Sequence, residues 1–313
     1  MRITLFIFAL SVLNFTGFAQ ERREMNMKEK TVRLILPQWQ GGVNPDYAFG
    51  AELLAFIAPP SENDETIRIP VSMDFNDTVV SGGIACEKTL LAQYDSTIKA
   101  FEQSNAKRVI VFGGDCSVSQ APFDYLSGLY GKGFGVLWLD AHPDISTIEE
   151  SEHAHEMVLA NLIGHGESSM QKKTAHPIDK NRVMYAGLIE KDLRWIDRAV
   201  KELDITMATP NDLSSNANMI EDWIKREGIT HLATHWDLDV LDPQMFRANT
   251  AGAPGMTRAQ YGCAVGEMQM TNVINMINSV SGMTTLVGLT IAEHMPWDAI
   301  NLRKAMQQLE IFK

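Results

Sequence analysis

The chain is poor in cysteine, with three residues of this type among 313: Cys86, Cys116 and Cys263. An odd number of thiols spread over a long chain argues against a disulfide framework. We expect Cys86 and Cys263 to be inert, buried thiols. Cysteine usage therefore says little about the cellular compartment.

Basic residues are also scarce relative to acidic ones. The sequence has 27 Lys and Arg against 39 Asp and Glu, a formal net charge of −12. Such a surface would repel nucleic acids and anionic membranes. We therefore expect no nucleic acid and, for the mature protein, no membrane as a partner, and a small, cationic molecule fits better.

Long apolar runs are lacking except at the N-terminus. Arg2 precedes an apolar run over residues 3–18, and the small residues Gly17 and Ala19 occupy positions −3 and −1 of a cleavage point before Gln20. This pattern is typical of a secretory signal peptide. The run is too short for a transmembrane helix of ordinary length.

The sequence therefore predicts a signal peptide over residues 1–19, a short leader over residues 20–30, and a secreted or periplasmic protein. Mass spectrometry of protein from the native host should find a mature chain that begins at or near Gln20. The alternative is a cytoplasmic protein translated from Met25 or Met27. Recovery of such a chain from the cytosol would remove the secretion prediction.

Apolar, β-branched runs bounded by Gly, Pro or Asp alternate with segments of helical spacing. The runs predict strands at residues 32–37, 67–71, 108–112, 135–139, 182–186, 231–234 and 285–291. The spacing predicts helices at residues 47–57, 88–103, 156–163, 216–225, 259–279 and 298–309. Continuous apolar runs are typical of parallel strands buried on both faces. We expect one α/β domain over residues 31–313, a doubly wound sheet that binds ligands at the carboxyl ends of its strands.

Polar clusters follow three of these strands. They are Gly-Gly-Asp-Cys-Ser at residues 113–117, Asp-Ala-His-Pro-Asp at 140–144, and His-Trp-Asp-Leu-Asp-Val-Leu-Asp-Pro at 235–243. Alternate side chains of an extended segment point to the same side, so Asp140, His142 and Asp144 can converge, as can Asp237 and Asp239.

Such a group of carboxylates would repel strongly in a partly dry cleft, and divalent cations are the usual remedy. Oxygen-rich ligation with one or two imidazoles suits Mn²⁺ better than structural Zn²⁺. Taken singly, each residue could be a helix cap, a turn residue or a core residue. Together, after buried strands, they predict a metal centre.

These segments resemble the signatures of the ureohydrolase family of arginases, agmatinases and formimidoylglutamases. The family pattern is Gly-Gly-Asp-His, Asp-Ala-His-x-Asp and Ser-x-Asp-x-Asp-x-x-Asp-Pro, and the match extends from Gly113 to Glu293. The resemblance implies a three-layer α/β/α fold with a central, mainly parallel sheet and two Mn²⁺ ions per chain. It also implies a metal-bridging hydroxide that attacks the amidine carbon of a guanidino or formimidoyl compound, and a homo-oligomer.

The resemblance also implies a role for each matching residue. The metal ligands would be the bridging Asp140 and Asp237, Cys116 and Asp144 at the first site, and His142 and Asp239 at the second. His155 matches the family's proton-shuttling histidine. Glu293 matches the carboxylate that holds the cationic substrate group.

Two departures from the family pattern fall at the metal centre. Cys116 stands where the family has a metal-binding His, and a soft thiolate shifts the first site toward zinc or iron. His235 replaces the usual Ser before the Asp-x-Asp. This imidazole could be a substitute ligand, or it could support a ligand or belong to the core.

Other departures concern the substrate. Ser146 and His153 stand in place of Asn residues that arginases use to hold the α-carboxylate and α-amine of arginine, and Glu156 follows His155 where arginases have Gly. These changes argue against L-arginine itself. Glu190 and Asp192 lie near the family's acidic amine-binding position or are simply solvated.

Three functions compete on this evidence. The favoured one is a metal-dependent hydrolase of linear amidine C–N bonds. The second is a degenerate ureohydrolase-fold protein with one metal or none, which acts as a binding or structural protein. The third, a deacetylase of the related superfamily fold, suits one metal, whereas the doubled Asp-x-Asp suits two.

Overall fold

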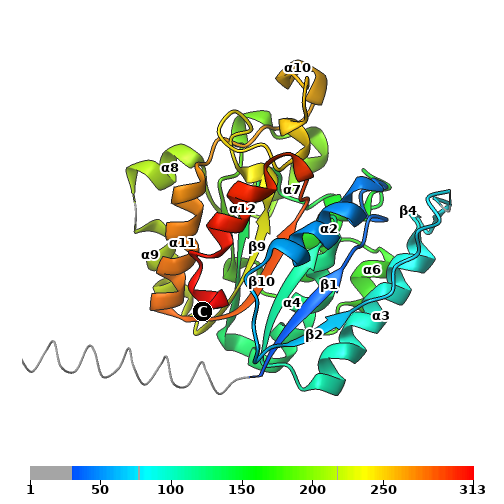
Figure 1. Cartoon of the computed structure of the whole chain (residues 1–313), viewed down its shortest axis with the longest axis horizontal. Coiled ribbons are helices and arrows are strands. Elements are labelled where there is room, and N and C mark those ends of the chain that lie inside the picture. The colour runs from blue at the N-terminus through cyan, green and yellow to red at the C-terminus, as the bar shows by residue number, and fades with distance from the viewer. Residues whose placement is uncertain (1–29, 77, 217) are drawn as a thin grey trace, which may run out of the picture.

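The computed structural model describes residues 30–76, 78–216 and 218–313 (Figure 1). The predicted signal peptide and nearly all of the predicted leader lie outside these residues. Within the described part of the chain, no helix combines the length and the apolar character that a membrane span requires.

An eight-stranded, fully parallel sheet forms the centre of the molecule. Its strands, in spatial order, are β2 (Glu65–Arg68), β1 (Thr31–Leu36), β5 (Arg108–Gly113), β10 (Thr285–Ala292), β9 (His231–Asp237), β6 (Phe134–Leu139), β7 (Val183–Ala186) and β8 (Thr206–Ala208). A short antiparallel pair, β3 (Val80–Ser81) and β4 (Ile84–Ala85), lies outside this sheet.

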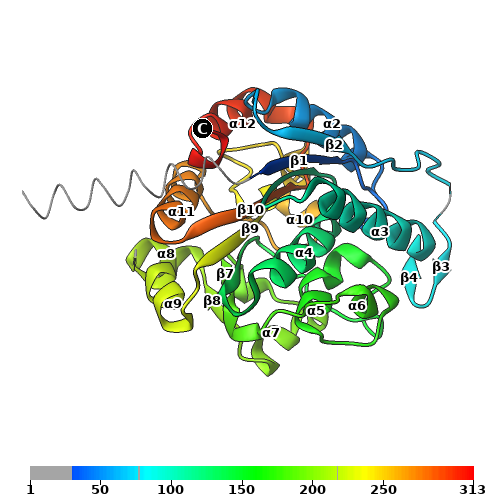
Figure 2. The same cartoon turned by 90° about the horizontal axis from the view of Figure 1, so that it is seen from below.

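Helices cover both faces of the sheet (Figure 2). One face is covered by α2 (Asp46–Ile57), α9 (Met219–Glu227), α11 (Met270–Met283) and α12 (Ala299–Met306). The other is covered by α3 (Glu87–Ser104), α4 (Gln120–Tyr130), α5 (Val158–Ile163) and α7 (Ala199–Glu202). The shorter helices are α6 (Ser169–Lys173), α8 (Pro210–Ser215) and α10 (Arg258–Tyr261). The predicted three-layer α/β/α fold is confirmed.

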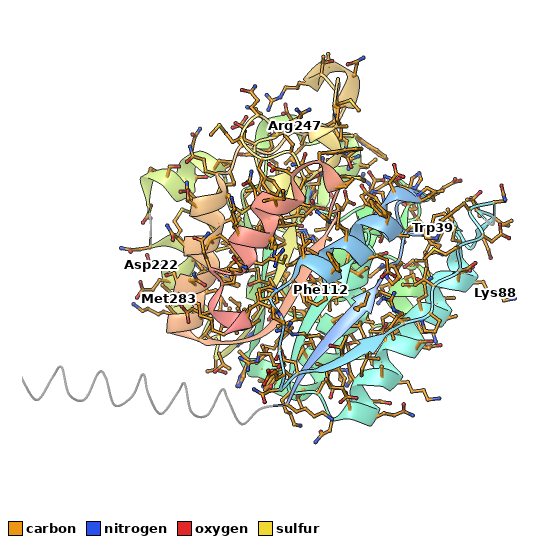
Figure 3. All side chains as sticks on the ribbon, viewed as in Figure 1. Trp39, Lys88, Phe112, Asp222, Arg247 and Met283 are labelled. Atoms are coloured by element: carbon orange, nitrogen blue, oxygen red, sulfur yellow. The ribbon has the colours of Figure 1, made fainter. Side chains whose placement is uncertain are left out.

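The apolar strands explain why the sheet is buried on both sides. On β5, Ile110 and Phe112 pack into the core on the α2 side, whereas Val109 and Val111 pack into the core on the α4 side. Successive side chains of a strand point to opposite faces, so a strand with a core on each side must be apolar throughout. In Figure 3, Phe112 lies in the interior.

The four central strands position the predicted site. β5, β10, β9 and β6 are neighbours, although β9 and β10 come late in the chain and insert between two strands formed earlier. Because all four are parallel, their carboxyl ends lie along one edge. A reversal of the strand order of this kind within a parallel sheet is where α/β proteins bind ligands.

The predicted helix over residues 259–279 is wrong. The chain forms α10 and α11 with residues 262–269 between them in irregular backbone. Gly262 ends α10 at a φ of 76°, and a Cβ on Gly266 would lie 2.0 Å from the carbonyl oxygen of Asp239. Close packing of this segment against the residues after β9 therefore overrides its helical spacing. The short strand β8 was not predicted.

Candidate metal centre

One cavity of about 140 Å³ lies at the carboxyl ends of the central strands. All eight predicted site residues line it: Cys116, Asp140, His142, Asp144, His155, Asp237, Asp239 and Glu293. The structure thus brings together residues separated by up to 177 positions in the chain. Their individual roles remain predictions.

The described residues form three overlapping groups whose ligand-type atoms lie within 4.8 Å of one another. These groups are Cys116, Asp140, His235 and Asp237; Asp140, His142 and Asp239; and Asp237, Asp239 and Glu293. Asp140, Asp237 and Asp239 each belong to two groups, so each of these carboxylates lies where it can contact two cation positions. Asp144 and His155 line the cavity outside these groups.

Tight turns after β6 and β9 aim the carboxylates into the cavity. The Oδ1 atom of Asp140 accepts a hydrogen bond from the backbone N–H of His142, and that of Asp237 accepts one from Asp239, both at 2.6 Å. These turns bring the His142 Nδ1 atom to 2.9 Å from an Asp239 carboxylate oxygen. Asp-x-His and Asp-x-Asp thus fold into similar loops on neighbouring strands.

The loop after β5 carries Cys116 to the same place. A Cβ on Gly114 would lie 1.6 Å from the carbonyl oxygen of Gln38, so only glycine allows this approach. The buried Asp115 carboxylate accepts a hydrogen bond from the Gly41 N–H at 2.8 Å, which holds two loops together. The Cys116 thiol then donates to Asp237 Oδ2 at 2.8 Å.

Asp144 and Glu293 have left-handed backbone conformations, with φ values of 47° and 59°. Non-glycine residues rarely adopt them, and they are often found where function requires a particular side-chain direction. Both carboxylates are buried, and the Asp144 Oδ2 atom has no hydrogen-bond partner among the described residues.

The cavity concentrates negative charge in a dry environment. Burial raises the pKa of Asp237, and the neighbouring carboxylates of Asp239, Glu293 and Asp140 raise it further. Burial and the Asp140 carboxylate likewise raise the pKa of Asp144. Such groups ionise together only if a cation offsets their repulsion.

The pKa values of Asp140 and Cys116 are shifted in opposite directions. Burial would raise the pKa of Asp140, but hydrogen bonds and charge from His142 and His235 outweigh it and lower that pKa. Burial raises the pKa of the Cys116 thiol, as does the nearby Asp237 carboxylate. A thiolate at Cys116 therefore depends on a neighbouring cation.

Glu293 lies beside two side chains that fix its position and charge. Tyr47 donates a hydrogen bond to Glu293 Oε2 at 2.5 Å. Burial raises the pKa of Glu293 to about 7, although the charge of His155 acts in the opposite direction. His155 is partly buried, and its Nδ1 atom lies 2.9 Å from the carbonyl oxygen of Gly41.

These carboxylates should make the metal-free protein less stable as the pH rises. The pKa of Glu293 is about 7 in the fold against an ordinary 4.5, so the folded chain holds an extra proton between these values and loses stability as the pH rises through that window. In chelator-treated protein, the fall in Tm from about pH 5 to about pH 7.5 should be smaller for Glu293→Gln than for wild type. Glu62→Gln, at an exposed position, is the control. Equal falls in all three proteins would contradict the prediction.

Sequence reasoning missed several cavity residues. Tyr47, Arg194, Thr250, Tyr261 and Cys263 also line it, together with Glu156. Cys263 was expected to be an inert, buried thiol but is exposed, because it lies in the irregular segment after α10. A polar or aromatic residue on a distant segment carries no local signal that it faces the site.

The acidic pair Glu190 and Asp192 is absent from the described lining of this cavity. Glu190 instead pairs with Lys201 at 3.0 Å. Arg194 lines the cavity, and its guanidinium contacts Glu156 at 2.6 Å and Asp197 at 3.0 Å. Ser146 is buried and donates to the carbonyl oxygen of Glu156 at 2.8 Å.

The fold and the cavity together define a doubly wound α/β protein with a carboxylate-rich candidate metal centre at the carboxyl edge of its sheet. The sequence profile of the arginase family matches residues 64–301. The chain belongs to the arginase family, which confirms the resemblance to ureohydrolases.

Individual relatives agree with this assignment. The arginase of Staphylococcus aureus strain COL is 27% identical over 147 residues, 44% of this chain and 48% of that protein. The mitochondrial arginase 1 of Arabidopsis thaliana is 23% identical over 208 residues, 66% of this chain and 53% of that protein. The chain thus spans about half the length of these relatives.

Solved structures show the same fold. The arginase of Bacillus caldovelox has a TM-score of 0.74 at 17% identity, with 91% of this chain and 98% of that chain covered. The formimidoylglutamase of Bacillus subtilis has a TM-score of 0.66 at 13% identity, with 91% and 86% covered. At these identities the likeness establishes the fold alone.

Proposed function

We propose that the protein is a metal-dependent hydrolase of linear amidine C–N bonds, with a guanidino or formimidoyl compound as its substrate. The observation that carries this proposal is the single cavity lined by Cys116, His142, His155, Glu293 and the four aspartates of the predicted centre. Membership of the arginase family supports it. The names of the solved relatives, arginase and formimidoylglutamase, support the substrate class.

The residues present fit a pair of divalent cations. Asp144 Oδ2, His142 Nε2 and His235 Nε2 are buried without a hydrogen-bond partner among the described residues. Buried polar atoms are normally paired, so these atoms indicate partners that are not protein. The raised pKa values of Asp144 and Asp237 indicate the same need for positive charge.

Asp140 and Asp237 would be shared between two Mn²⁺ ions, as the family pattern implies, and their membership of two of the three groups supports this. His142 and Asp239 would complete the second site, and Cys116 and Asp144 would belong to the first, where zinc or iron is the alternative to manganese. When bound, the ions would lower the pKa of a shared water so that it supplies a hydroxide nucleophile at neutral pH.

Glu293 would hold the amidinium group of the substrate. Its carboxylate is buried and aligned by the hydrogen bond from Tyr47. A buried, hydrogen-bonded carboxylate binds a planar, cationic amidine through charge-assisted hydrogen bonds. The cationic substrate would also keep Glu293 ionised against the effect of burial.

His155 would accept a proton from the attacking water at Nε2 and pass it to the leaving amine. Its Nδ1–H can donate to the Gly41 carbonyl oxygen, which fixes the tautomer with Nε2 as the proton acceptor. The ring lines the cavity without belonging to the three groups of ligand-type atoms. This position suits proton transfer rather than ligation.

The cavity is small, at about 140 Å³, against several hundred for sites that enclose a drug-sized ligand. It therefore suits the amidine end of a slender molecule. The ion pair of Glu156 and Arg194 lies on its wall, and the arginine-holding amides of arginases are absent from Ser146 and His153. Guanidines other than L-arginine are the preferred candidates.

Two measurements on the same preparation test the proposal. Protein purified without chelator should contain about two ions per chain. It should also release urea from a guanidine, or formamide from a formimidoyl compound, in a screen of both classes. Loss of release on chelation and its return with Mn²⁺ or Zn²⁺ would link the measurements.

The second candidate is a degenerate family member that binds a ligand with one metal or none. Cys116, in place of a ligand His, is the observation that favours it. Stoichiometric metal without turnover on any amidine would support this alternative. Secretion or a periplasmic location, and a homo-oligomeric assembly, remain further proposals.

A further inference from the structure

His235 is a buried histidine whose ring is held by two neighbouring strands and by the loop after β5. It lies on β9, two residues before Asp237, and pairs in register with Trp138 on β6 and Thr290 on β10. Its ring stacks on the Trp138 indole, with ring centres 3.8 Å apart and planes within 16° of each other. The side chain is fully buried.

One ring nitrogen is bound by the protein and the other is not. The Nδ1 atom lies 2.7 Å from Ser119 Oγ and 3.2 Å from Thr290 Oγ1. Nε2 has no hydrogen-bond partner among the described residues and lies 3.7 Å from Asp140 Oδ2. A proton on Nδ1, donated to either hydroxyl, leaves the Nε2 lone pair directed at the cluster, as a ligand requires.

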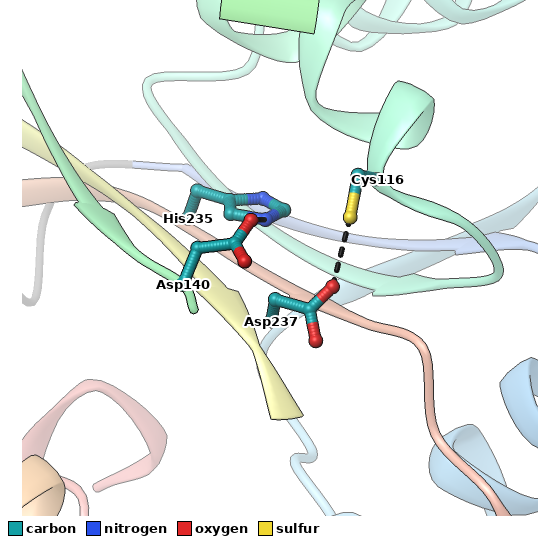
Figure 4. Close-up of side chains that lie close together, drawn as sticks. All are labelled: Cys116, Asp140, His235 and Asp237. Carbon is teal, nitrogen blue, oxygen red and sulfur yellow. Dashed lines mark hydrogen bonds and ion pairs between the residues drawn. The ribbon is translucent and has the colours of Figure 1, made fainter. Parts of the chain in front are cut away.

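Cys116 and Asp237 complete the surroundings of Nε2 (Figure 4). Ligand-type atoms of Cys116, Asp140, His235 and Asp237 all lie within 4.8 Å of one another. A tetrahedral ion with nitrogen and oxygen ligands at about 2.0 Å and sulfur at about 2.3 Å separates these atoms by roughly 3.3 to 3.6 Å. The 3.7 Å between His235 Nε2 and Asp140 Oδ2 is close to this spacing.

We infer that His235 is a ligand of the first metal and supplies the imidazole that the family pattern places at position 116. The pattern has His at position 116 and Ser at 235, whereas this chain has Cys116 and His235. The exchange keeps one imidazole at the site and adds a thiolate. This inference rests on the proposed metal centre and changes the identity of its ligands.

The exchange gives the two sites different donor sets. With His235 as a ligand, the first site is the group of Cys116, Asp140, His235 and Asp237, and Asp144 lies outside it. This group combines sulfur, nitrogen and two carboxylates, a set that favours a tetrahedral ion such as zinc. The second, around His142, Asp140 and Asp239, has no sulfur and suits manganese. The protein should therefore hold zinc more tightly at the first site than at the second.

Two substitutions separate ligation from support. His235→Asn retains an amide near the Nδ1 position, within reach of Ser119 and Thr290, but has nothing at the position of Nε2. His235→Gln extends an amide oxygen toward that position. Loss of a residue that only supports a ligand weakens metal binding by roughly 10- to 100-fold, so loss of a ligand should exceed that range.

Zinc titration of wild-type and variant full-length protein is the test. His235→Asn should reduce zinc affinity at the first site by more than about a hundredfold, with a smaller loss for His235→Gln. In cobalt-substituted protein, His235→Asn should alter the visible bands of the first site, and Cys116→Ser should remove the thiolate-to-cobalt band. The control is His231→Asn at the opposite end of β9, which should change neither.

The double variant Cys116→His/His235→Ser provides a rescue. It restores the family's ligand set, so it should bind about two manganese ions, with a zinc preference at least tenfold lower than that of wild type. Unchanged zinc affinity and cobalt spectra in both His235 variants would overturn the inference. A wild-type protein that binds no metal would overturn the inference and the proposed function together. A metal-loaded wild type without hydrolysis, in which His235→Asn still loses zinc, would support the inference while the proposed function fails.

Discussion

Asp237→Asn should remove both metal ions and abolish hydrolysis. The Asp237 carboxylate belongs both to the group with Cys116 and to the group with Asp239 and Glu293, and with Asp140 it is expected to serve both ions. A neutral amide cannot offset two cations. Because bound metal supplies several kcal/mol of stabilisation to the transition state, the rate should fall by roughly a thousandfold or more. Elemental analysis and urea or formamide release measure the two effects.

The same variant should behave differently once metal has been removed from all samples. In chelated protein the Asp237 carboxylate is buried among other carboxylates that raise its pKa. Its replacement by an amide relieves that repulsion, so the metal-free variant should have a Tm at least as high as that of metal-free wild type. Asp204→Asn, at an exposed position, should change neither metal content nor Tm. Full metal content in Asp237→Asn would show that the bridging role is assigned wrongly.

Glu293→Gln should abolish amidine hydrolysis while metal content stays at the wild-type level. The carboxylate is assigned to the substrate, and removal of one partner of a buried, hydrogen-bonded charge pair typically costs about 2–5 kcal/mol, or roughly 30- to 4000-fold in kcat/KM. Tyr47→Phe removes only the hydrogen bond to Glu293 Oε2. It should cause a smaller loss, about ten- to a hundredfold.

The metal content and the turnover of Glu293→Gln distinguish three roles for this residue. Glu293 lies close enough to Asp237 and Asp239 to be a metal ligand itself. If Glu293→Gln loses one ion, the residue holds metal and not substrate. If turnover is unimpaired, its role is structural. Glu62→Gln controls for the general effect of removing a glutamate.

The central strands could be predicted because a strand that is buried on both faces forms a continuous run of apolar residues in the sequence. β5, β6 and β10 are apolar at nearly every position, and β9 was found although its carboxyl end extends to Asp237. β8 has three residues and lies at the sheet edge, where short length and partial exposure weaken the pattern. The helix predicted over residues 259–279 failed because close packing of Gly266 against Asp239 is a long-range contact.

The convergence of the candidate site followed from the motifs and one topological rule. Asp140, Asp237 and Glu293 follow different strands, and parallel strands bring their carboxyl ends to one edge. The participation of Tyr47 and Arg194 could not be predicted, since they reach the cavity from α2 and from the chain after β7. Their place depends on how whole elements pack.

The sequence by itself determined the α/β class, the family and the eight residues that meet in the cavity. Buried strands and ligand motifs each consist of contiguous residues, so both can be recognised without the fold. Only the tertiary structure decided the strand order, the irregular segment beside the cavity and the direction of the His235 ring. That ring is oriented by Trp138, Ser119 and Thr290 from three other segments. A side chain's direction depends on neighbours that only the folded chain brings together, so the sequence left the role of His235 open.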